Sequence, residues 1–226
     1  MSYRALVLFD IDGTLVRRAG PHHREALVHG VRRVTGMETT TEGIPVQGML
    51  DPDIAGVMMR TAGAKPAEIR TAMPEVLRAA ERHYLRVCPV LTEKHCPGVV
   101  PVLERLTRRG MLLGLVTGNL TRIGWRKLER AGLRGYFRFG AFGEMAKTRA
   151  GLAKMAIREA RAQGWIGRGE PMSLIGDAPQ DIEAARANRL RAISVKTGIT
   201  PVADLEALRP DVLLRDLREL RLRMVL

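Results

Sequence analysis

Cysteine and aromatic residues are scarce in this chain of 226 residues. Two cysteines are too few for a disulfide framework. Cys88, His95 and Cys96 have no fourth partner at zinc-finger spacing, so we interpret both cysteines as free thiols. Aromatic residues make up only 4% of the chain, and no basic run is interleaved with them, which argues against a surface that stacks nucleic-acid bases.

Long apolar runs are also missing. No segment approaches the roughly 18 apolar residues that a membrane-spanning helix needs. The apolar run at residues 5–9 is too short for the hydrophobic region of a secretory signal. These absences predict a cytoplasmic protein without a membrane partner.

Acidic residues are outnumbered, with 24 Asp and Glu against 37 Lys and Arg, for a formal net charge of +13. All but six of the basic residues are Arg. The electrostatic field of such a positive charge attracts anions, including phosphorylated metabolites, nucleic acids and membrane surfaces. Two interpretations stay open: the charge serves an anionic partner, or Arg simply replaces Lys over a solvated surface.

Short continuous apolar runs recur along the chain, as expected for strands buried on both faces of a parallel sheet. They cover residues 5–9, 111–116, 172–175, 192–195 and 212–214. Helical patterns lie between the later runs, at residues 99–109, 121–131, 149–163 and 179–188. This alternation predicts an α/β protein with a doubly wound, Rossmann-like parallel sheet. The Arg-rich residues 215–223 are expected on a terminal helix.

One long segment breaks the alternation. Residues 16–96 contain helical patterns at 23–35, 52–62 and 66–87 but no comparable apolar run. We therefore predict a core domain of residues 1–15 and 97–226, with an inserted α-helical cap domain of residues 16–96. Pro97 and Gly98 mark the return to the core.

Two carboxylates directly follow the first apolar run. Asp10 and Asp12 stand two residues apart on an extended chain, so they are expected on the same side, and Gly13 permits a sharp turn beyond them. Ligands of open α/β sheets gather at the carboxyl ends of the strands. Paired acids there suit Mg²⁺, and one acid can have its pKa raised and donate a proton. A solvated loop with two helix-capping acids is the alternative.

Polar residues follow two further runs. Thr117, Gly118 and Asn119 could form an anion site from a hydroxyl and backbone amides, although this is also an ordinary strand-to-helix turn. Asp177 is expected to be a helix N-cap, and Asp181 lies four residues later near the positive end of that helix. Together with the first acid pair, these aspartates indicate a metal site.

The combined motifs resemble those of the haloacid dehalogenase-like hydrolase superfamily. The sequences DIDGT at residues 10–14, TGN at 117–119 and GDAPQD at 176–181 are similar to its first, second and fourth motifs. The position of the insert resembles that of members with a helical cap, such as phosphoglycolate phosphatases. The resemblance covers essentially the whole chain.

The resemblance implies a role for each acid. Asp10 would be a nucleophile that attacks phosphorus and forms an aspartyl-phosphate. Mg²⁺ would be held by the side chains of Asp10 and Asp177 and by the backbone carbonyl of Asp12. Asp12 would protonate the leaving alcohol and then activate water. Asp181 would hold the metal's waters or its own loop.

The resemblance also implies a phosphate-binding set. Thr117, Gly118 and Asn119 would hold the phosphoryl oxygens. The superfamily's third motif usually places a Lys, often as Lys-Pro, before a helix, but no Lys-Pro occurs in this chain. The spacing to later apolar residues favours Arg149 as this cation, with Lys147 as the competitor.

Several polar residues of the predicted cap could meet a substrate. Arg17, Arg18, His22 and His23 lie just beyond the first motif, and Gln47 and Asp51 lie between predicted cap helices. We expect each of these six to be solvated or to cap a helix, with contact to a polar substrate as the alternative.

The resemblance favours a Mg²⁺-dependent phosphatase acting on a small phosphorylated metabolite, either phosphoglycolate-like or a sugar phosphate. A phosphomutase or phosphonatase is the enzymatic alternative, and Asp12 argues against a dehalogenase. A phospho-accepting signalling domain uses similar residues, but it usually lacks an inserted cap. A nucleic-acid-binding protein on a degenerate scaffold is disfavoured by the four intact aspartates. The oligomeric state is unknown from sequence.

Overall fold

The computed structural model describes residues 3–226. Six strands form one parallel sheet in the order β3-β2-β1-β4-β5-β6. The strands are β1 (Leu6–Phe9), β2 (Leu112–Val116), β3 (Phe139–Ala141), β4 (Met172–Gly176), β5 (Arg191–Val195) and β6 (Val212–Leu214). From β1 the chain adds β2 and then β3 on one side of the sheet. It then crosses back, so that β4, β5 and β6 extend the sheet on the other side of β1. The carboxyl ends of β1 and β4 therefore lie at the switch point of the sheet, where such folds bind ligands.

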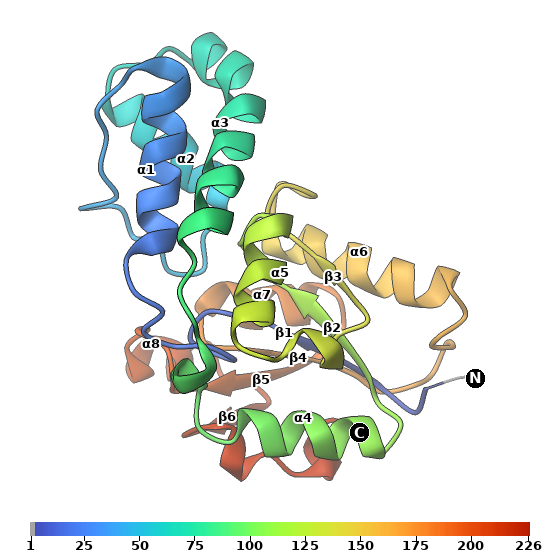
Figure 1. The fold of residues 1–226 in the computed structure, drawn as a ribbon. Coiled ribbons are helices and arrows are strands. Elements are labelled where there is room, and N and C mark those ends of the chain that lie inside the picture. Colours follow the sequence, from blue (N-terminus) through green and yellow to red (C-terminus); the bar gives the residue numbers. More distant parts are fainter. Residues whose placement is uncertain (1–2) are drawn as a thin grey trace.

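Helices cover both faces of this sheet (Figure 1). They are α4 (Val99–Arg108), α5 (Thr121–Arg130), α6 (Arg149–Ala162), α7 (Pro179–Ala187) and α8 (Val202–Ala207). Side chains of β1 alternate between two apolar clusters: Val7 and Phe9 pack with α4 and α5, and Leu6 and Leu8 pack with α6 and α7. Burial on both sides explains the continuous apolar run. The prediction of a doubly wound α/β core is confirmed.

Three helices of the predicted cap lie together beyond the sheet (Figure 1). They are α1 (His22–Thr35), α2 (Asp51–Thr61) and α3 (Pro66–Val87). Gly30 of α1 lies so close to α3 that a Cβ there would be 2.6 Å from the Val76 carbonyl oxygen. The two connections to the core run side by side, because Val16 pairs with His95 in an antiparallel bridge. The domain boundaries at residues 15/16 and 96/97 stay a prediction.

The sequence-based assignment differs from the structure in three elements. Strand β3 and helix α8 were not expected. The terminal helix predicted for residues 215–223 is wrong, because this segment forms short 3₁₀ turns at Leu217–Glu219 and Leu222–Met224. Cys88 and Cys96 are buried, free thiols. Across residues 3–226, every helix falls short of the length and apolar character that a bilayer span requires.

Candidate active site

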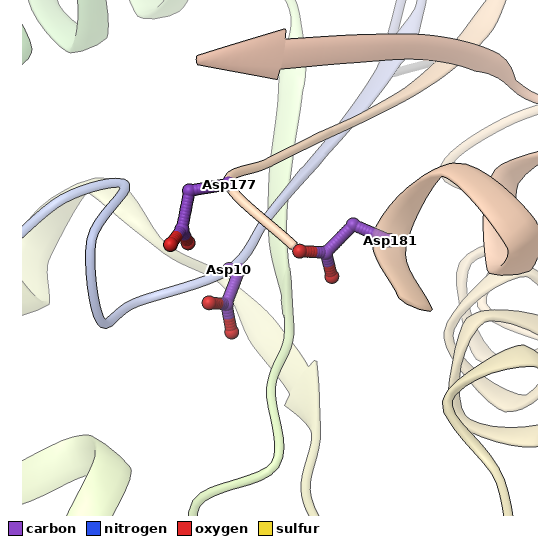
Figure 2. Close-up of side chains that lie close together, drawn as sticks. All are labelled: Asp10, Asp177 and Asp181. Atoms are coloured by element: carbon purple, nitrogen blue, oxygen red, sulfur yellow. The ribbon is translucent and has the colours of Figure 1, made fainter. Parts of the chain in front are cut away.

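Three buried carboxylates converge at the switch point of the sheet (Figure 2). Asp10 follows β1, and its amide donates to the carbonyl oxygen of Ile175 in β4 at 2.9 Å. Asp177 follows β4, and Asp181 lies in the first turn of α7. One oxygen from each carboxylate lies within 4.8 Å of the other two. Parallel pairing of β1 with β4 thus brings acids 167 residues apart in the sequence into one cluster.

Asp177 is enclosed by main chain on two sides. The N-cap of α7 is Ala178 rather than Asp177, so the capping role expected for Asp177 is wrong and its carboxylate points into the cluster. A Cβ at either Gly13 or Gly198 would overlap that carboxylate, and Gly13 also has a positive φ of 82°. Thr14 Oγ1 donates to Asp177 Oδ1 at 3.2 Å. These contacts fix the position of Asp177.

Burial disfavours the charged form of all three carboxylates. Burial raises the pKa of Asp10, and it does so despite the neighbouring Arg149 guanidinium. Burial, with the charges of Asp10 and Asp181, raises the pKa of Asp177 well above its usual value. Burial also raises the pKa of Asp181 to about 7. Such mutual repulsion favours either protonation or a cation among the acids.

The cluster fits Mg²⁺. Hard divalent cations prefer oxygen ligands, and all three groups supply carboxylate oxygens. Asp181 Oδ2 accepts from the Ala178 amide at 3.2 Å and so holds its loop. Asp181 Oδ1 is buried and accepts no hydrogen bond from the described residues, although Arg149 Nε lies 3.2 Å away. Buried oxygen atoms with spare acceptor capacity are what a cation site requires.

Arg149 contacts two of these acids. It is the first residue of α6, whose N-cap Thr148 accepts a side-chain hydrogen bond from the Gly151 amide. Arg149 Nη1 donates to Asp10 Oδ1 at 3.1 Å, and Nε pairs with Asp181. Lys147, the competing candidate, is exposed. Of the two, only Arg149 touches Asp10 and lines the adjacent cavity.

Asp12 has different partners from Asp10. Lys127 Nζ donates to both Asp12 oxygens, at 2.7 and 2.6 Å, and Asn119 Nδ2 donates to Oδ2 at 2.8 Å. Burial opposes the charge on Asp12, but Lys127 and His23 outweigh it and lower the pKa of this carboxyl. The Asp12 side chain therefore lies outside the three-acid cluster, and only its main-chain carbonyl is left as a potential metal ligand.

The residues at 117–119 form a buried corner after β2. Thr117 Oγ1 accepts from Asn119 Nδ2 at 2.7 Å, and both side chains are buried. The Gly118 carbonyl accepts from the Asp51 amide at 2.9 Å. A Cβ on Gly118 would overlap the main chain at Met49, so only glycine allows the cap to approach this closely. Thr117, Gly118 and Asn119 all line the same cavity as Asp10.

That cavity, of about 620 Å³, lies between the strand ends and the cap. Two of the cap residues expected to be solvated or to cap a helix make specific contacts with the core. Asp51 is 2% exposed, and its Oδ2 accepts from the Leu120 amide at 2.8 Å. Gln47 Nε2 donates to Asp177 Oδ2 at 2.5 Å. The cap thus contacts the core at two places: Asp51 bonds to the main chain at Gly118 and Leu120, and Gln47 bonds to the acid cluster.

Four other predicted cap residues differ in exposure. Arg17 and Arg18 line the cavity while remaining exposed. His22 is half-buried, with Nδ1 3.6 Å from a carboxylate oxygen of Glu25. His23 lines the cavity, and its Nε2 is 2.9 Å from Asp51 Oδ2.

Lys127 is the polar residue that the sequence interpretation missed. Its side chain is completely buried, and it lies on α5 among Ile123, Gly124 and Leu128, which are buried too. A lysine inside an apolar stripe at helical spacing is a detectable signal, because Lys is almost never fully buried without a partner. The partner here is Asp12.

Known proteins resemble this chain in sequence and in fold. The sequence model of the protein family described as "haloacid dehalogenase-like hydrolase" matches residues 5–188. A phosphoglycolate phosphatase of Synechococcus elongatus is 30% identical over 212 residues, covering 92% of this chain and 91% of that protein. One of Agrobacterium fabrum is 30% identical over 221 residues, covering 93% and 88%. A β-phosphoglucomutase from Clostridium difficile shares the fold, with a TM-score of 0.71 at 15% identity over 98% of this chain and 94% of that one. With its acid cluster at the switch point of the sheet, the chain belongs to the haloacid dehalogenase-like hydrolase family.

Proposed function

We propose that this hydrolase is a Mg²⁺-dependent phosphatase that cleaves small phosphate monoesters through an aspartyl-phosphate on Asp10. The observation that carries the proposal is the buried cluster of Asp10, Asp177 and Asp181, in which Asp10 and Asp177 line a cavity and Arg149 is bonded to Asp10. The two curated relatives named phosphoglycolate phosphatase support the same activity.

The chemistry needs a nucleophile and a group that moves a proton. An Asp10 oxygen attacks phosphorus, the ester P–O bond breaks, and Asp12 gives its proton to the departing oxygen. Water then attacks the phosphorus, Asp12 takes a proton from it, and phosphate leaves with Asp10 restored. Lys127 and His23 lower the pKa of Asp12, and the negative charge of a bound phosphate monoester would act in the opposite direction, toward the protonated form needed first.

Charge stabilisation comes from the surrounding residues. Arg149 orients Asp10 and can offer its remaining donors to phosphoryl oxygens. Thr117 and the main-chain amides after it would hold the same oxygens, since Thr117, Gly118 and Asn119 line the cavity together with Asp10. The side chains of Asp10 and Asp177, with the Asp12 carbonyl, would hold Mg²⁺, and Asp181 would lie beside it. Bound Mg²⁺ would neutralise the repulsion between the Asp10 carboxylate and the phosphate.

The cavity favours a substrate with a second anionic group. Arg17, Arg18 and Arg24 from the cap all line it. A cavity of about 620 Å³ exceeds what a phosphate alone fills, and guanidinium groups pair well with carboxylates. We therefore propose a phosphate monoester bearing a carboxylate, such as phosphoglycolate, in preference to a neutral sugar phosphate.

A panel of phosphate monoesters tests this substrate class. We expect a higher kcat/KM for phosphoglycolate than for a neutral alkyl phosphate of similar size. Changing both Arg18 and Arg24 to Gln should raise KM for phosphoglycolate by about tenfold and leave the neutral ester within about twofold, because a charged hydrogen bond is lost for one substrate only. Equal losses on both substrates would contradict the carboxylate assignment.

Metal dependence has a readout that does not use activity. Mg²⁺ at about 100 times its Kd should raise Tm by about 5–10 °C, because it binds only the folded chain and relieves repulsion among the acids. Asp177→Asn should abolish most of this shift, whereas Asp204→Asn, on the exposed start of α8, should keep it. A native Tm that is unchanged by Mg²⁺ would count against the metal site.

A further inference from the structure

The two oxygens of the Asp177 carboxylate accept hydrogen bonds from different parts of the chain. Thr14, which follows β1, donates from Oγ1 to Oδ1 at 3.2 Å, and Gln47 of the cap donates from Nε2 to Oδ2 at 2.5 Å. Among residues 3–226, these are the two side chains that donate to this carboxylate. An ionised carboxylate can only accept, so the amide of Gln47 must present its nitrogen to Asp177.

The loop that carries Gln47 lies against the start of α7. The main-chain carbonyl of Gln47 accepts from Gln180 Nε2 at 3.4 Å. Gly48 has a positive φ of 68°, and a Cβ there would overlap the side-chain amide of Gln180 and lie 3.1 Å from the Cβ of Ala178. Gln47 therefore reaches Asp177 from a loop that packs closely on the core.

The donor that meets Asp177 is uncharged, although the rest of the cap presents charged donors to the same cavity. Arg17, Arg18 and Arg24 line that cavity with exposed side chains. A guanidinium group bonded to Asp177 would neutralise the carboxylate and repel a divalent cation. A neutral amide donates a hydrogen bond and leaves the negative charge available to an ion. The choice of side chain at position 47 is thus compatible with a cation at Asp177.

A carboxylate that binds a metal has lone pairs to spare. Its two oxygens offer about four acceptor sites, and a hydrogen bond and a metal can share one carboxylate. Hydrogen bonds from outside the ligand set orient the ligand, and their loss typically lowers metal affinity about 10- to 100-fold. Thr14 and Gln47 occupy this outer position around Asp177.

We propose that Gln47 is a positioning residue through which the cap strengthens the binding of Mg²⁺ at Asp177. This inference rests on the proposed function, in which Asp177 holds the ion. Gln47 orients the carboxylate from one side, and Thr14 orients it from the other. The cap then contributes to metal affinity in addition to substrate binding.

Calorimetric titration with Mg²⁺ tests this role without any substrate. For Gln47→Leu, which removes the donor, we expect the Kd for Mg²⁺ to rise by at least about tenfold. Gln47→Asn should change the Kd in the same direction, because its amide is one methylene group shorter. Gln47 is half-buried, so the metal-free Tm of both variants should stay within about 3 °C of native. A merely structural role would instead lower the metal-free Tm and leave the Kd unchanged.

Kinetics at two Mg²⁺ concentrations separate metal binding from substrate contact, because Gln47 also lines the cavity. At a concentration equal to the native Kd, kcat/KM for phosphoglycolate should fall about fivefold in Gln47→Leu, since a tenfold weaker site is mostly empty. At about 100 times the Kd of the variant, kcat/KM should return to within about threefold of native. A loss that persists at saturating Mg²⁺ would assign Gln47 to the substrate and overturn the proposal.

Matched variants give the same chemical changes elsewhere. Gln163 is exposed at the end of α6 and is not among the residues that line the cavity, so Gln163→Leu and Gln163→Asn should bind Mg²⁺ with native affinity. Native affinity in Gln47→Leu would overturn the inference. Tighter binding would overturn it too, because the amide would then occupy the place of the ion. If Gln47→Leu fails to fold, Gln47→Asn decides.

The native protein distinguishes this inference from the proposed function. Heat of Mg²⁺ binding that is absent in the native protein would overturn the metal site itself, and with it the proposed function. Native binding that is retained in full by both Gln47 variants would overturn only the role of Gln47.

Discussion

Replacing Asp10 with asparagine is expected to lower kcat for 4-nitrophenyl phosphate by at least about a thousandfold. The amide keeps the shape of the side chain but cannot attack phosphorus, so no aspartyl-phosphate forms. Burial opposes the charge of Asp10, so removing that charge should not destabilise the metal-free protein severely. Steady-state kinetics measure the loss of kcat, and acid-quench trapping of labelled phosphoenzyme measures the loss of the aspartyl-phosphate.

Asp204→Asn is a suitable control, because Asp204 is exposed and is not among the residues that line the cavity. It should retain native kcat and a native amount of trapped phosphoenzyme. Turnover by Asp10→Asn at the native rate would exclude Asp10 as the nucleophile. It would leave the family membership and the fold untouched.

The second large effect is expected at Arg149. Arg149→Met leaves Asp10 and Asp181 buried without their cation, which should destabilise the fold by about 3–5 kcal/mol. It should also lower kcat/KM by at least about a hundredfold, because a charged donor at the phosphoryl group is lost. Lys147→Met removes the exposed competitor and should change neither quantity by more than about twofold. Comparable losses in both variants would contradict the assignment of this cation.

The destabilisation of Arg149→Met should depend on pH. Buried acids with raised pKa values favour the native state while they are protonated, and they lose that contribution as pH rises through the native pKa. The pKa of Asp181 is already raised to about 7 with Arg149 present. We therefore expect the deficit in Tm relative to the native protein to be smaller at pH 5 than at pH 8. A deficit that grew on acidification would contradict this account.

The core of the fold could be predicted because its strands are buried on both faces. Residues 5–9 and 112–116 are uninterrupted apolar runs, which solvated segments rarely show. Strand β3 has only three residues and Gly140 at its centre, so it gives no comparable signal. The Arg-rich end had helical spacing, but Asp216 caps a short turn by accepting from the Arg218 amide. The hydrogen bond of Asp216 to the main chain therefore determines the local structure at residues 216–219, in spite of the helical spacing of the sequence.

The acids of the site were predictable and their partners were not. Asp10 and Asp177 were expected to converge because each follows a strand, and parallel pairing brings strand ends to one edge. The sequence could not show that Asp12 turns toward α5, since this depends on a lysine 115 residues away. From the sequence alone, Asp51 likewise looks like a solvated residue at the start of a helix. Its hydrogen bond with the Leu120 amide depends on the packing of the cap against the core.

The two walls of the cavity differ in what they can tolerate. On the core side, Gly13 and Gly198 leave no room beside Asp177 for even one methyl group. On the cap side, Arg17, Arg18 and Arg24 line the cavity with exposed side chains. A substitution at either core glycine would therefore displace Asp177, whereas a substitution at these three arginines would leave the acids in place. New substrate preferences, natural or engineered, should arise in cap residues 17–24.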